Sequence, residues 1–188
     1  MMGNAMLQFH EWDILLLRWL HQNRATALDD FLANVSYVTS FVSIGVMLVV
    51  LLWSFKTRSK ALRFQSFQLM LAVVTVAIFT FCLKLLISRQ RPFITYADVE
   101  KLSEGGSHSF PSGHTAEAFA LATAILCLFK NRALSIVAFS WAIVIAYSRM
   151  ALGVHYPSDV LGGAIVGCAV SFLMLKLSMP KNVQPGQS

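Results

Sequence analysis

Two stretches of the sequence contain no charged residue and are long enough to cross a lipid bilayer. They cover residues 31–55 and 64–83, and about 20 helical residues span a hydrocarbon core of roughly 30 Å. Three later apolar segments have ionisable borders; counted with these borders they hold 18 residues each and reach about 27 Å as helices. The pattern predicts an all-α, polytopic membrane helix bundle with about five transmembrane helices, at residues 35–55, 64–87, 113–130, 133–150 and 159–177.

The composition supports a membrane chain and excludes a disordered or collagen-like one. Of the 188 residues, 56% are hydrophobic and 13% are charged, whereas about a quarter of the residues in a soluble domain are charged. The net charge of +6 does not indicate a nucleic-acid partner, because Lys and Arg are scattered between apolar runs. The size predicts one integral-membrane domain over residues 1–180, followed by a disordered tail at residues 181–188.

The first 34 residues are predicted to form amphipathic helices that lie in the membrane interface. Apolar residues recur there at helical spacing, with charged residues between them: Trp12, Leu15, Leu16, Trp19 and Leu20. A second such helix, over residues 27–37, is expected to be capped by Asp29 or Asp30, and His10 and His21 are expected to be interfacial. The alternative is a sixth span over the first 30 residues, which Arg18 and the other charges there disfavour.

Basic residues are distributed unequally between the predicted loops. They follow the first, third and fifth spans: Lys56, Arg58, Lys60, Arg63, Lys130, Arg132, Lys176 and Lys181. Because Lys and Arg in short loops mark the cytoplasmic side, we predict an outside N-terminus and a cytoplasmic C-terminus. All nine acidic residues fall on or near the opposite side. The compact chain is expected in a bacterial cytoplasmic (inner) membrane.

Two further features of the spans predict packing. Gly163 and Gly167, four residues apart in the last span, permit close approach of a neighbouring helix. Each of the three cysteines lies in a separate apolar run and is expected to be a buried free thiol: Cys82, Cys127 and Cys168. No cluster of carboxylates, or of Cys and His, has the spacing of a metal site, so no metal and no cofactor are predicted.

Ionisable residues at membrane borders are costly, which makes them candidates for function. On the predicted extracytoplasmic side they form three groups, Lys84 with Arg91-Pro92, Pro111-Ser112-Gly113-His114, and Ser148-Arg149 with His155 and Asp159. The three cations, Lys84, Arg91 and Arg149, would repel one another in a poorly solvated site unless an anion neutralised them. Guanidinium forks, and backbone N–H groups at a helix N-terminus near Ser112 and Gly113, both suit phosphate.

The two histidines in these groups suggest chemistry beyond binding. His155 and Asp159 are four residues apart across the entry to a helix, so the carboxylate can fix the imidazole tautomer, as it does for an activated nucleophile or base. His114, on a different helix, is then free to act as a general acid toward a leaving oxygen.

Together the three motifs resemble the signature of the type-2 phosphatidic acid phosphatases, which is Lys-x6-Arg-Pro, Pro-Ser-Gly-His and Ser-Arg-x5-His-x3-Asp. The resemblance implies a metal-independent phosphatase of membrane lipids, related in site design to vanadium haloperoxidases and bacterial acid phosphatases. It implies that His155 attacks phosphorus and forms a phosphohistidine, that Asp159 orients it, and that His114 protonates the leaving oxygen and then activates water. The phosphate oxygens would be held by Lys84, Arg91, Ser112, Gly113 and Arg149.

The substrate is expected to be recognised within the membrane surface, because only residues 93–110 separate the first two motifs. A polyprenyl diphosphate, best undecaprenyl diphosphate, is the leading expectation. Phosphatidate, phosphatidylglycerol phosphate and lipid A phosphates are alternatives, as are a lipid phosphotransferase and a non-catalytic lipid-binding protein. The expected partners are the bilayer and the lipid substrate, with no obligate protein partner.

Overall fold

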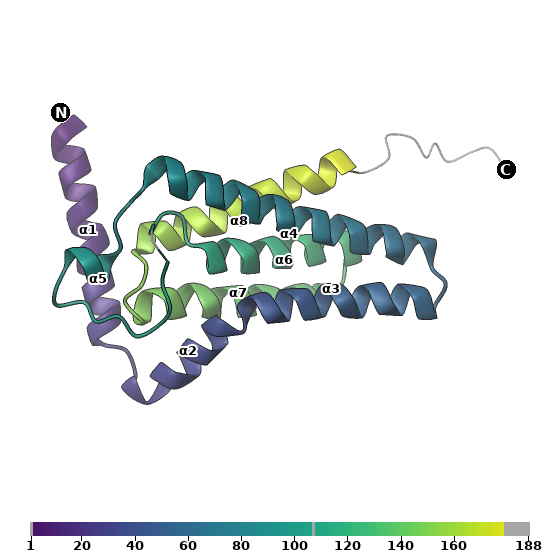
Figure 1. Cartoon of the computed structure of the whole chain (residues 1–188), viewed down its shortest axis with the longest axis horizontal. Helices are drawn as coiled ribbons and strands as arrows, with labels where there is room; N and C mark the ends of the chain where they lie inside the picture. Colours follow the sequence, from purple (N-terminus) through teal and green to yellow (C-terminus); the bar gives the residue numbers. More distant parts are fainter. Residues whose placement is uncertain (1, 107, 179–188) are drawn as a thin grey trace.

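The computed structural model describes residues 2–106 and 108–178, and within them every regular element is helical (Figure 1). The helices are α1 (Met2–Gln22), η1 (Thr26–Leu28), α2 (Asp29–Tyr37), α3 (Thr39–Lys56), α4 (Lys60–Ile87), α5 (Pro92–Thr95), α6 (Gly113–Phe129), α7 (Arg132–Ala151) and α8 (Pro157–Ser178). This architecture confirms the all-α prediction. The tail predicted at residues 181–188 lies outside the described residues.

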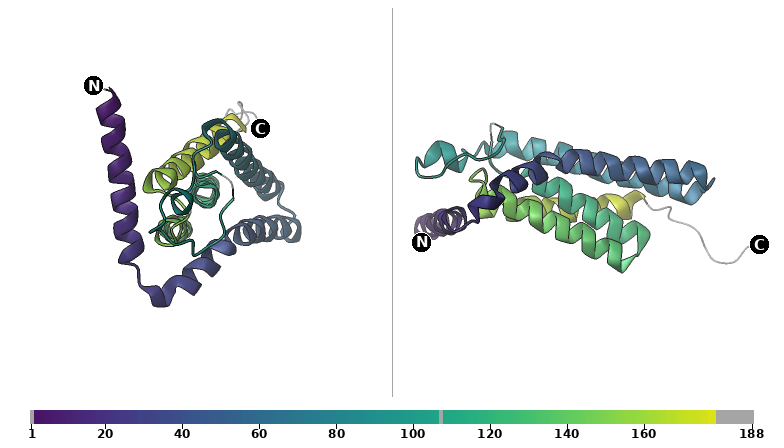
Figure 2. Two further views of the ribbon diagram at one scale, coloured as in Figure 1. Left: turned by 60° about the vertical axis from the view of Figure 1, so that its left-hand side comes forward. Right: turned by 90° about the horizontal axis from the view of Figure 1, so that it is seen from below.

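Five of these helices match the five predicted spans and lie side by side as a bundle (Figures 1 and 2). Helices α3, α4, α7 and α8 are each long and apolar enough to cross a membrane, and α6 is a shorter apolar helix. Many large apolar side chains on the outer faces are exposed, among them Phe41, Leu52, Ile78, Ile136 and Leu161. Apolar surface on this scale suits contact with lipid. The protein is therefore a multi-pass membrane protein.

Helix α6 is the centre of the bundle and packs against α4, α7 and α8. Small residues dominate its buried positions and let neighbouring helices approach closely: Thr115, Ala116, Ala118, Ala120, Ala122, Thr123 and Ala124. A methyl group added to Gly163 would collide with the carbonyl oxygen of Ser112, and one added to Gly167 would collide with that of Ala116. The close packing predicted for this glycine pair is confirmed.

The ends of four spanning helices bring the three sequence motifs to one end of the bundle. Helix α4 ends and α6 begins there, and the short turn between α7 and α8 lies there as well (left in Figure 1). The turn requires a glycine, since Gly153 has a φ of +71° and any side chain would meet the carbonyl oxygen of Glu100. The cavity described below opens at this end.

Helix α1 lies crosswise at the same end of the bundle (Figures 1 and 2). It is not among the helices that are apolar enough to span a membrane. Its large exposed apolar side chains fit the interfacial prediction: Trp12, Leu15, Leu16 and Trp19. The opposite face packs on the protein and buries Asp13, Ile14 and Leu17.

Two details of the N-terminal prediction are wrong. Helix α2 begins at Asp29 itself, with Leu28 as its uncapped N-cap residue, because the Asp29 carboxylate instead accepts from Nε of Arg24 at 2.9 Å. His21 is buried within the protein, where its Nδ1 lies 2.8 Å from the carbonyl oxygen of Ala151. Its Nε2 accepts a hydrogen bond from the backbone N–H of Glu100, so this histidine ties α1 to the end of α7 and to the loop between α5 and α6.

The burial predicted for the cysteines is also wrong. All three are free thiols, but Cys82 is exposed and Cys127 and Cys168 are half-buried. The physical reason is that an apolar run in a membrane helix faces lipid on one side and protein on the other. Apolar neighbours in the sequence therefore do not bury a side chain inside the protein.

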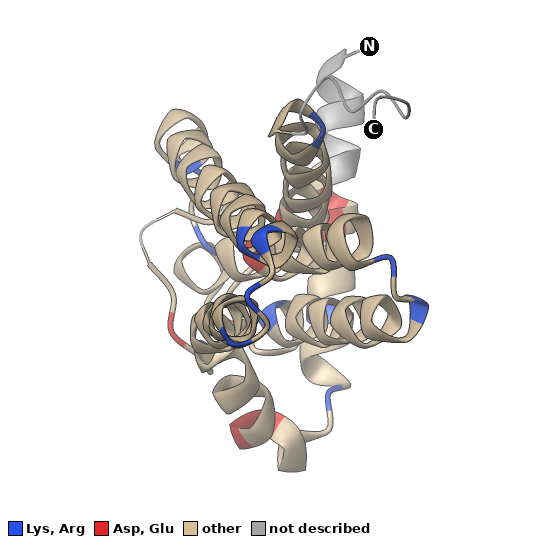
Figure 3. Cartoon of the chain, turned by 90° about the vertical axis from the view of Figure 1, so that its right-hand side faces the viewer, with Lys and Arg blue, Asp and Glu red and all other residues tan. Residues whose placement is uncertain are grey.

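The two turns at the end of the bundle opposite the motifs are basic and carry no acidic residue (Figure 3). Their Lys and Arg residues lie in these turns or in the adjoining helix ends: Lys56, Arg58, Lys60, Arg63, Lys130 and Arg132. Basic residues in such short connections are what the positive-inside rule counts. The orientation of the bundle in a membrane stays a prediction from that rule.

Candidate active site

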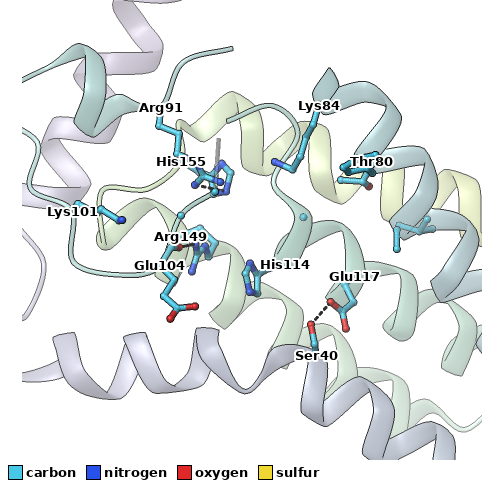
Figure 4. Close-up of a pocket in the computed structure, with 16 residues that line it drawn as sticks. Ser40, Thr80, Lys84, Arg91, Lys101, Glu104, His114, Glu117, Arg149 and His155 are labelled. Atoms are coloured by element: carbon cyan, nitrogen blue, oxygen red, sulfur yellow. Dashed lines mark hydrogen bonds between the residues drawn. The ribbon is translucent and has the colours of Figure 1, made fainter. Parts of the chain in front are cut away.

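A cavity of about 680 Å³ opens at the end of the bundle where the motifs meet (Figure 4). It is lined by six of the eight residues that the sequence singled out: Lys84, Arg91, Gly113, His114, Arg149 and His155. The other two, Ser112 and Asp159, are fully buried behind it. The structure thus brings together residues that are up to 75 positions apart in the sequence.

His155 lies in the turn between α7 and α8 and is 1% exposed. Its Nδ1 is 3.4 Å from Oδ2 of Asp159, and Nη1 of Arg91 lies 3.3 Å from its Nε2. Because the Arg91 guanidinium can only donate, this contact assigns the lone pair to Nε2 and the proton to Nδ1. Burial lowers the pKa of His155 to about 3, and the positive charge of Arg91 lowers it further. The hydrogen bond to Asp159 raises this pKa but does not outweigh burial. The imidazole is neutral at neutral pH.

The Asp159 carboxylate is held on all sides. Oδ2 accepts hydrogen bonds from the backbone N–H of Tyr156 at 2.9 Å and from the hydroxyl of Ser109. Oδ1 accepts from Nη1 of Arg89 at 2.7 Å. These donors favour the charged carboxylate, so Asp159 is placed to orient the histidine beside it.

The three cations around His155, which are Lys84, Arg91 and Arg149, form no salt bridge with any acidic residue in the described part of the chain. Arg149 is 1% exposed and donates to the hydroxyls of Ser36 and Ser103 and to the carbonyl oxygen of Glu104. Uncompensated buried charge is costly, so this arrangement favours an anion between the guanidinium groups.

The other N–H donors of these cations are only partly paired within the protein. Nη1 of Arg91 donates to the carbonyl oxygen of Val154 at 2.9 Å, and Nζ of Lys84 donates to that of His108 at 3.0 Å. The Nε atoms of Arg91 and Arg149 are buried and have no partner among the described residues. Buried donors are almost always hydrogen-bonded, so these two atoms add to the uncompensated polarity around the cavity.

His114 lies in the first turn of α6 and faces the cavity (Figure 4). Glu117, one turn further on, also lines the cavity and accepts a hydrogen bond from the hydroxyl of Ser40 at 2.8 Å. Within residues 2–106 and 108–178, no three His, Cys, Asp or Glu side chains are grouped closely enough to hold a metal ion. The cavity lining thus combines two histidines and several cations with the carboxylates of Glu104 and Glu117.

Ser112 makes hydrogen bonds within the protein, and its role in binding phosphate stays a prediction. It is the N-cap of α6, but its N–H donates to the carbonyl oxygen of Asp159 at 2.9 Å, and its hydroxyl accepts from that of Thr115 at 2.9 Å. Ser112 therefore joins the start of α6 to the start of α8. In this structure the cavity is lined by Gly113 and not by Ser112.

Sequence reasoning missed three residues that contact Asp159 or its partners. Ser109 and Arg89 bind the carboxylate directly, and Asp13 of α1 binds Arg89. Arg89 lies two positions before Arg91 in the same loop, which is a signal that the motif analysis passed over. Asp13 carried no such signal. An acidic residue between apolar residues of an amphipathic helix is expected to face solvent, so the sequence did not indicate that Asp13 is buried against Arg89.

Fold and site together define a class: an all-α, multi-pass membrane protein with a cation-lined anion site around two histidines. The chain belongs to the PAP2 superfamily, whose sequence model matches residues 65–182. The match confirms the resemblance to the type-2 phosphatidic acid phosphatases.

Individual relatives fall into more than one group. The lipid A 4'-phosphatase of Bacteroides thetaiotaomicron is 49% identical over 63 residues, which are 34% of this chain and only 28% of that protein. Undecaprenyl-diphosphatase BcrC of Bacillus subtilis is 27% identical over 146 residues, covering 76% of this chain and 72% of that protein. The crystal structure of Aquifex aeolicus LpxE matches with a TM-score of 0.74 and 30% identity, covering 88% of this chain and 95% of that chain.

Proposed function

We propose that the protein is a metal-independent phosphatase that removes phosphate from a membrane lipid through a phosphohistidine. The observation that carries this proposal is the surroundings of His155: a neutral imidazole with its Nδ1 beside a buried carboxylate and its Nε2 beside a buried arginine. A site that only bound an anionic lipid would need the cations but not an oriented imidazole.

The proposed reaction has two displacements at phosphorus. In the first, Nε2 of His155 forms a bond to phosphorus while the bond to the lipid oxygen breaks, and His114 gives that oxygen a proton. In the second, His114 takes a proton from water, the water oxygen attacks phosphorus, and the bond to Nε2 breaks. Inorganic phosphate then leaves, and His155 returns to its starting form.

Charge stabilisation by the cations supports the rate of both steps. The oxygens of the transferring group would lie among Lys84, Arg91 and Arg149, with the backbone N–H of Gly113 at the start of α6 as a further donor. Donors fixed in advance around developing charge commonly supply the largest part of catalysis in phosphoryl transfer. Most of them are already held by hydrogen bonds within the protein, so they need little rearrangement to bind the group.

A lipid with a polyprenyl diphosphate head, best undecaprenyl diphosphate, is the substrate that we propose first. Apolar residues of α4, including Val76, Ala77 and Phe81, line the same cavity as the cations, which suits a hydrocarbon chain next to phosphate. Lys101 also lines the cavity and offers a fourth cation to a second phosphate. The similarity to an undecaprenyl-diphosphatase over most of the chain supports this choice.

A lipid A phosphate is the second candidate, because the segment shared with the Bacteroides lipid A 4'-phosphatase has the higher identity. For either lipid we propose a cytoplasmic membrane location with the cavity facing outward. The basic turns at the opposite end of the bundle support this orientation.

Phosphate release by purified protein tests the proposal. We expect release in the presence of EDTA from at least one lipid in a panel of undecaprenyl diphosphate, phosphatidate, phosphatidylglycerol phosphate and lipid A. The substitution His155→Ala should abolish release, whereas His10→Ala, which changes an exposed histidine of α1, should not. Folded protein that releases no phosphate from any of the four lipids, or His155→Ala protein that remains active, would contradict the proposal.

A further inference from the structure

A second carboxylate and a second arginine lie behind the pair formed by His155 and Asp159. Nη1 of Arg89 donates to Oδ1 of Asp159 at 2.7 Å, and Nη2 donates to Oδ2 of Asp13 at 2.6 Å. Arg89 belongs to the loop between α4 and α5, whereas Asp13 belongs to α1. One guanidinium therefore bridges two buried carboxylates from distant parts of the chain.

Further contacts fix the orientation of that guanidinium. Oδ1 of Asp13 accepts from the backbone N–H of Ser158 at 2.8 Å, and Oδ2 accepts from the Ser158 hydroxyl at 2.5 Å. The same hydroxyl accepts from Nη1 of Arg89 at 2.7 Å. The guanidinium carbon also lies 3.8 Å from the centre of the Tyr156 ring, close enough for a cation–π contact.

These contacts decide how the Asp159 carboxylate is turned. Its side chain has no exposure, and its two oxygens have different partners: Oδ1 faces Arg89, and Oδ2 faces Nδ1 of His155. A carboxylate with both oxygens engaged in this way cannot rotate without breaking a charge-assisted hydrogen bond. Without Arg89, two buried carboxylates would be left near each other with no cation between them, which is strongly unfavourable.

We infer that Asp13 and Arg89 are positioning residues for the predicted nucleophile, an inference that rests on the proposed function. Asp13 holds Arg89, Arg89 holds Asp159, and Asp159 keeps the proton on Nδ1 of His155 so that Nε2 faces the phosphate. Since Asp13 lies on α1, which carries large exposed apolar side chains, the position of this membrane-surface helix is linked to the geometry of the site.

Steady-state kinetics with matched variants test the inference. Asp13→Asn keeps the size of the side chain and removes its charge, and Arg89→Gln removes the bridge. We expect each to lower kcat by roughly 10- to 100-fold, the scale of effect that a small misplacement of a reacting group produces, with KM nearly unchanged. Arg89→Lys, which keeps the charge but can reach only one carboxylate well, should recover part of kcat.

The control is Asp98→Asn. It removes another ion pair of α1, in which Asp98 accepts from Nε of Arg18 at 2.7 Å, and that pair is exposed and does not contact Asp159. We expect wild-type kcat and a wild-type melting temperature for this variant. Wild-type kcat in both Asp13→Asn and Arg89→Gln would overturn the inference.

The tautomer of His155 provides a readout that needs no turnover. In nitrogen NMR of histidine-labelled protein, we expect one tautomer with the proton on Nδ1 in the wild type and in Asp98→Asn, and a mixture in Asp13→Asn and Arg89→Gln. An unchanged tautomer in both variants would overturn the inference, even if kcat fell. If the wild type releases no phosphate from any lipid, the proposed function fails, and the tautomer measurement still decides the positioning role.

Discussion

Nη1 of Arg91 lies 3.3 Å from Nε2 of His155, so a buried cation and the predicted attacking atom share one small space. The same Nη1 donates to the carbonyl oxygen of Val154, the residue before His155. Arg91 is the N-cap of α5, and these contacts tie that helix to the turn that carries the histidine. A phosphoryl group bound by Arg91 would therefore have its phosphorus next to Nε2.

This relationship makes Arg91→Lys a demanding test of phosphate binding. Lysine keeps the charge but loses the planar fork that binds two phosphate oxygens at once and reaches Val154. We expect kcat/KM to fall by about 10²- to 10³-fold, the usual cost of removing a fixed donor from developing charge. The measurement is phosphate release from the best lipid of the panel. The same exchange at Arg18, which is partly exposed and lies outside the cavity lining, is the control. A fall of less than twofold in Arg91→Lys would show that Arg91 does not hold the phosphate.

Retention of the phosphoenzyme in a His114→Gln variant tests the division of labour between the two histidines. His114 faces the cavity from α6 and is proposed to activate water in the second displacement. With a substrate whose leaving group needs no proton, we expect the first displacement to proceed and the second to become rate-limiting. Mass spectrometry of rapidly quenched protein should then find phosphate on the peptide that contains His155. Its absence, with substrate consumed, would assign hydrolysis to a direct attack by water.

Vanadate should inhibit the enzyme competitively with the lipid phosphate. Five-coordinate vanadate resembles the transition state of the first displacement, and the site offers both a neutral imidazole and three cations, Lys84, Arg91 and Arg149, to hold it. Analogues of a transition state bind more tightly than substrates do. Inhibition should be lost in His155→Ala, measured as vanadate-dependent thermal stabilisation because this variant is expected to be inactive. Equal stabilisation of the wild type and His155→Ala would place the vanadate elsewhere.

The sequence was sufficient to predict the five helices of the bundle, four of which are long and apolar enough to cross a membrane, because apolar length in a membrane protein is tied directly to bilayer thickness. It also identified the lining of the cavity, since ionisable side chains at membrane borders are costly and mark functional sites. Asp13 and Arg89 escaped detection for a physical reason. The two residues form an ion pair although they are 76 positions apart in the sequence. The spacing of residues along one helix contains no information about such a distant partner.

The environment of His155 was likewise only half predictable. The spacing of four residues correctly placed Asp159 beside it. That His155 is almost fully buried and neutral follows from the surrounding fold, in which α1, α5 and the loop before α6 cover the end of the bundle. The placement of Ser112 behind the cavity has the same origin, because its N–H is used to join α6 to α8.

The burial of His155 predicts how stability depends on pH. Its pKa in the folded protein is lowered to about 3, below the value of about 6.5 for an exposed histidine in the unfolded chain. Between these values the unfolded chain binds a proton that the folded protein does not, so this group makes stability fall as the pH is lowered from about 6.5 toward 3. Replacing it in His155→Asn should make the melting temperature less sensitive to acid. A pH dependence identical to that of the wild type would contradict the burial of a neutral imidazole.

The last prediction concerns the contact between α6 and α8. His114 lies at the start of α6 and His155 lies just before α8, so this contact helps to position both histidines. A side chain at Gly167 would collide with the carbonyl oxygen of Ala116, and backbone cannot yield as a flexible side chain can. Overpacking of this kind costs about 1–3 kcal/mol, so Gly167→Leu should lower the melting temperature in detergent and reduce kcat. Gly45→Leu makes the same change on α3, where an added Cβ atom would meet nothing within 4 Å, and should leave both quantities near the wild-type values. Equal melting temperatures for the two variants would show that close approach of α6 and α8 does not limit the stability of the bundle.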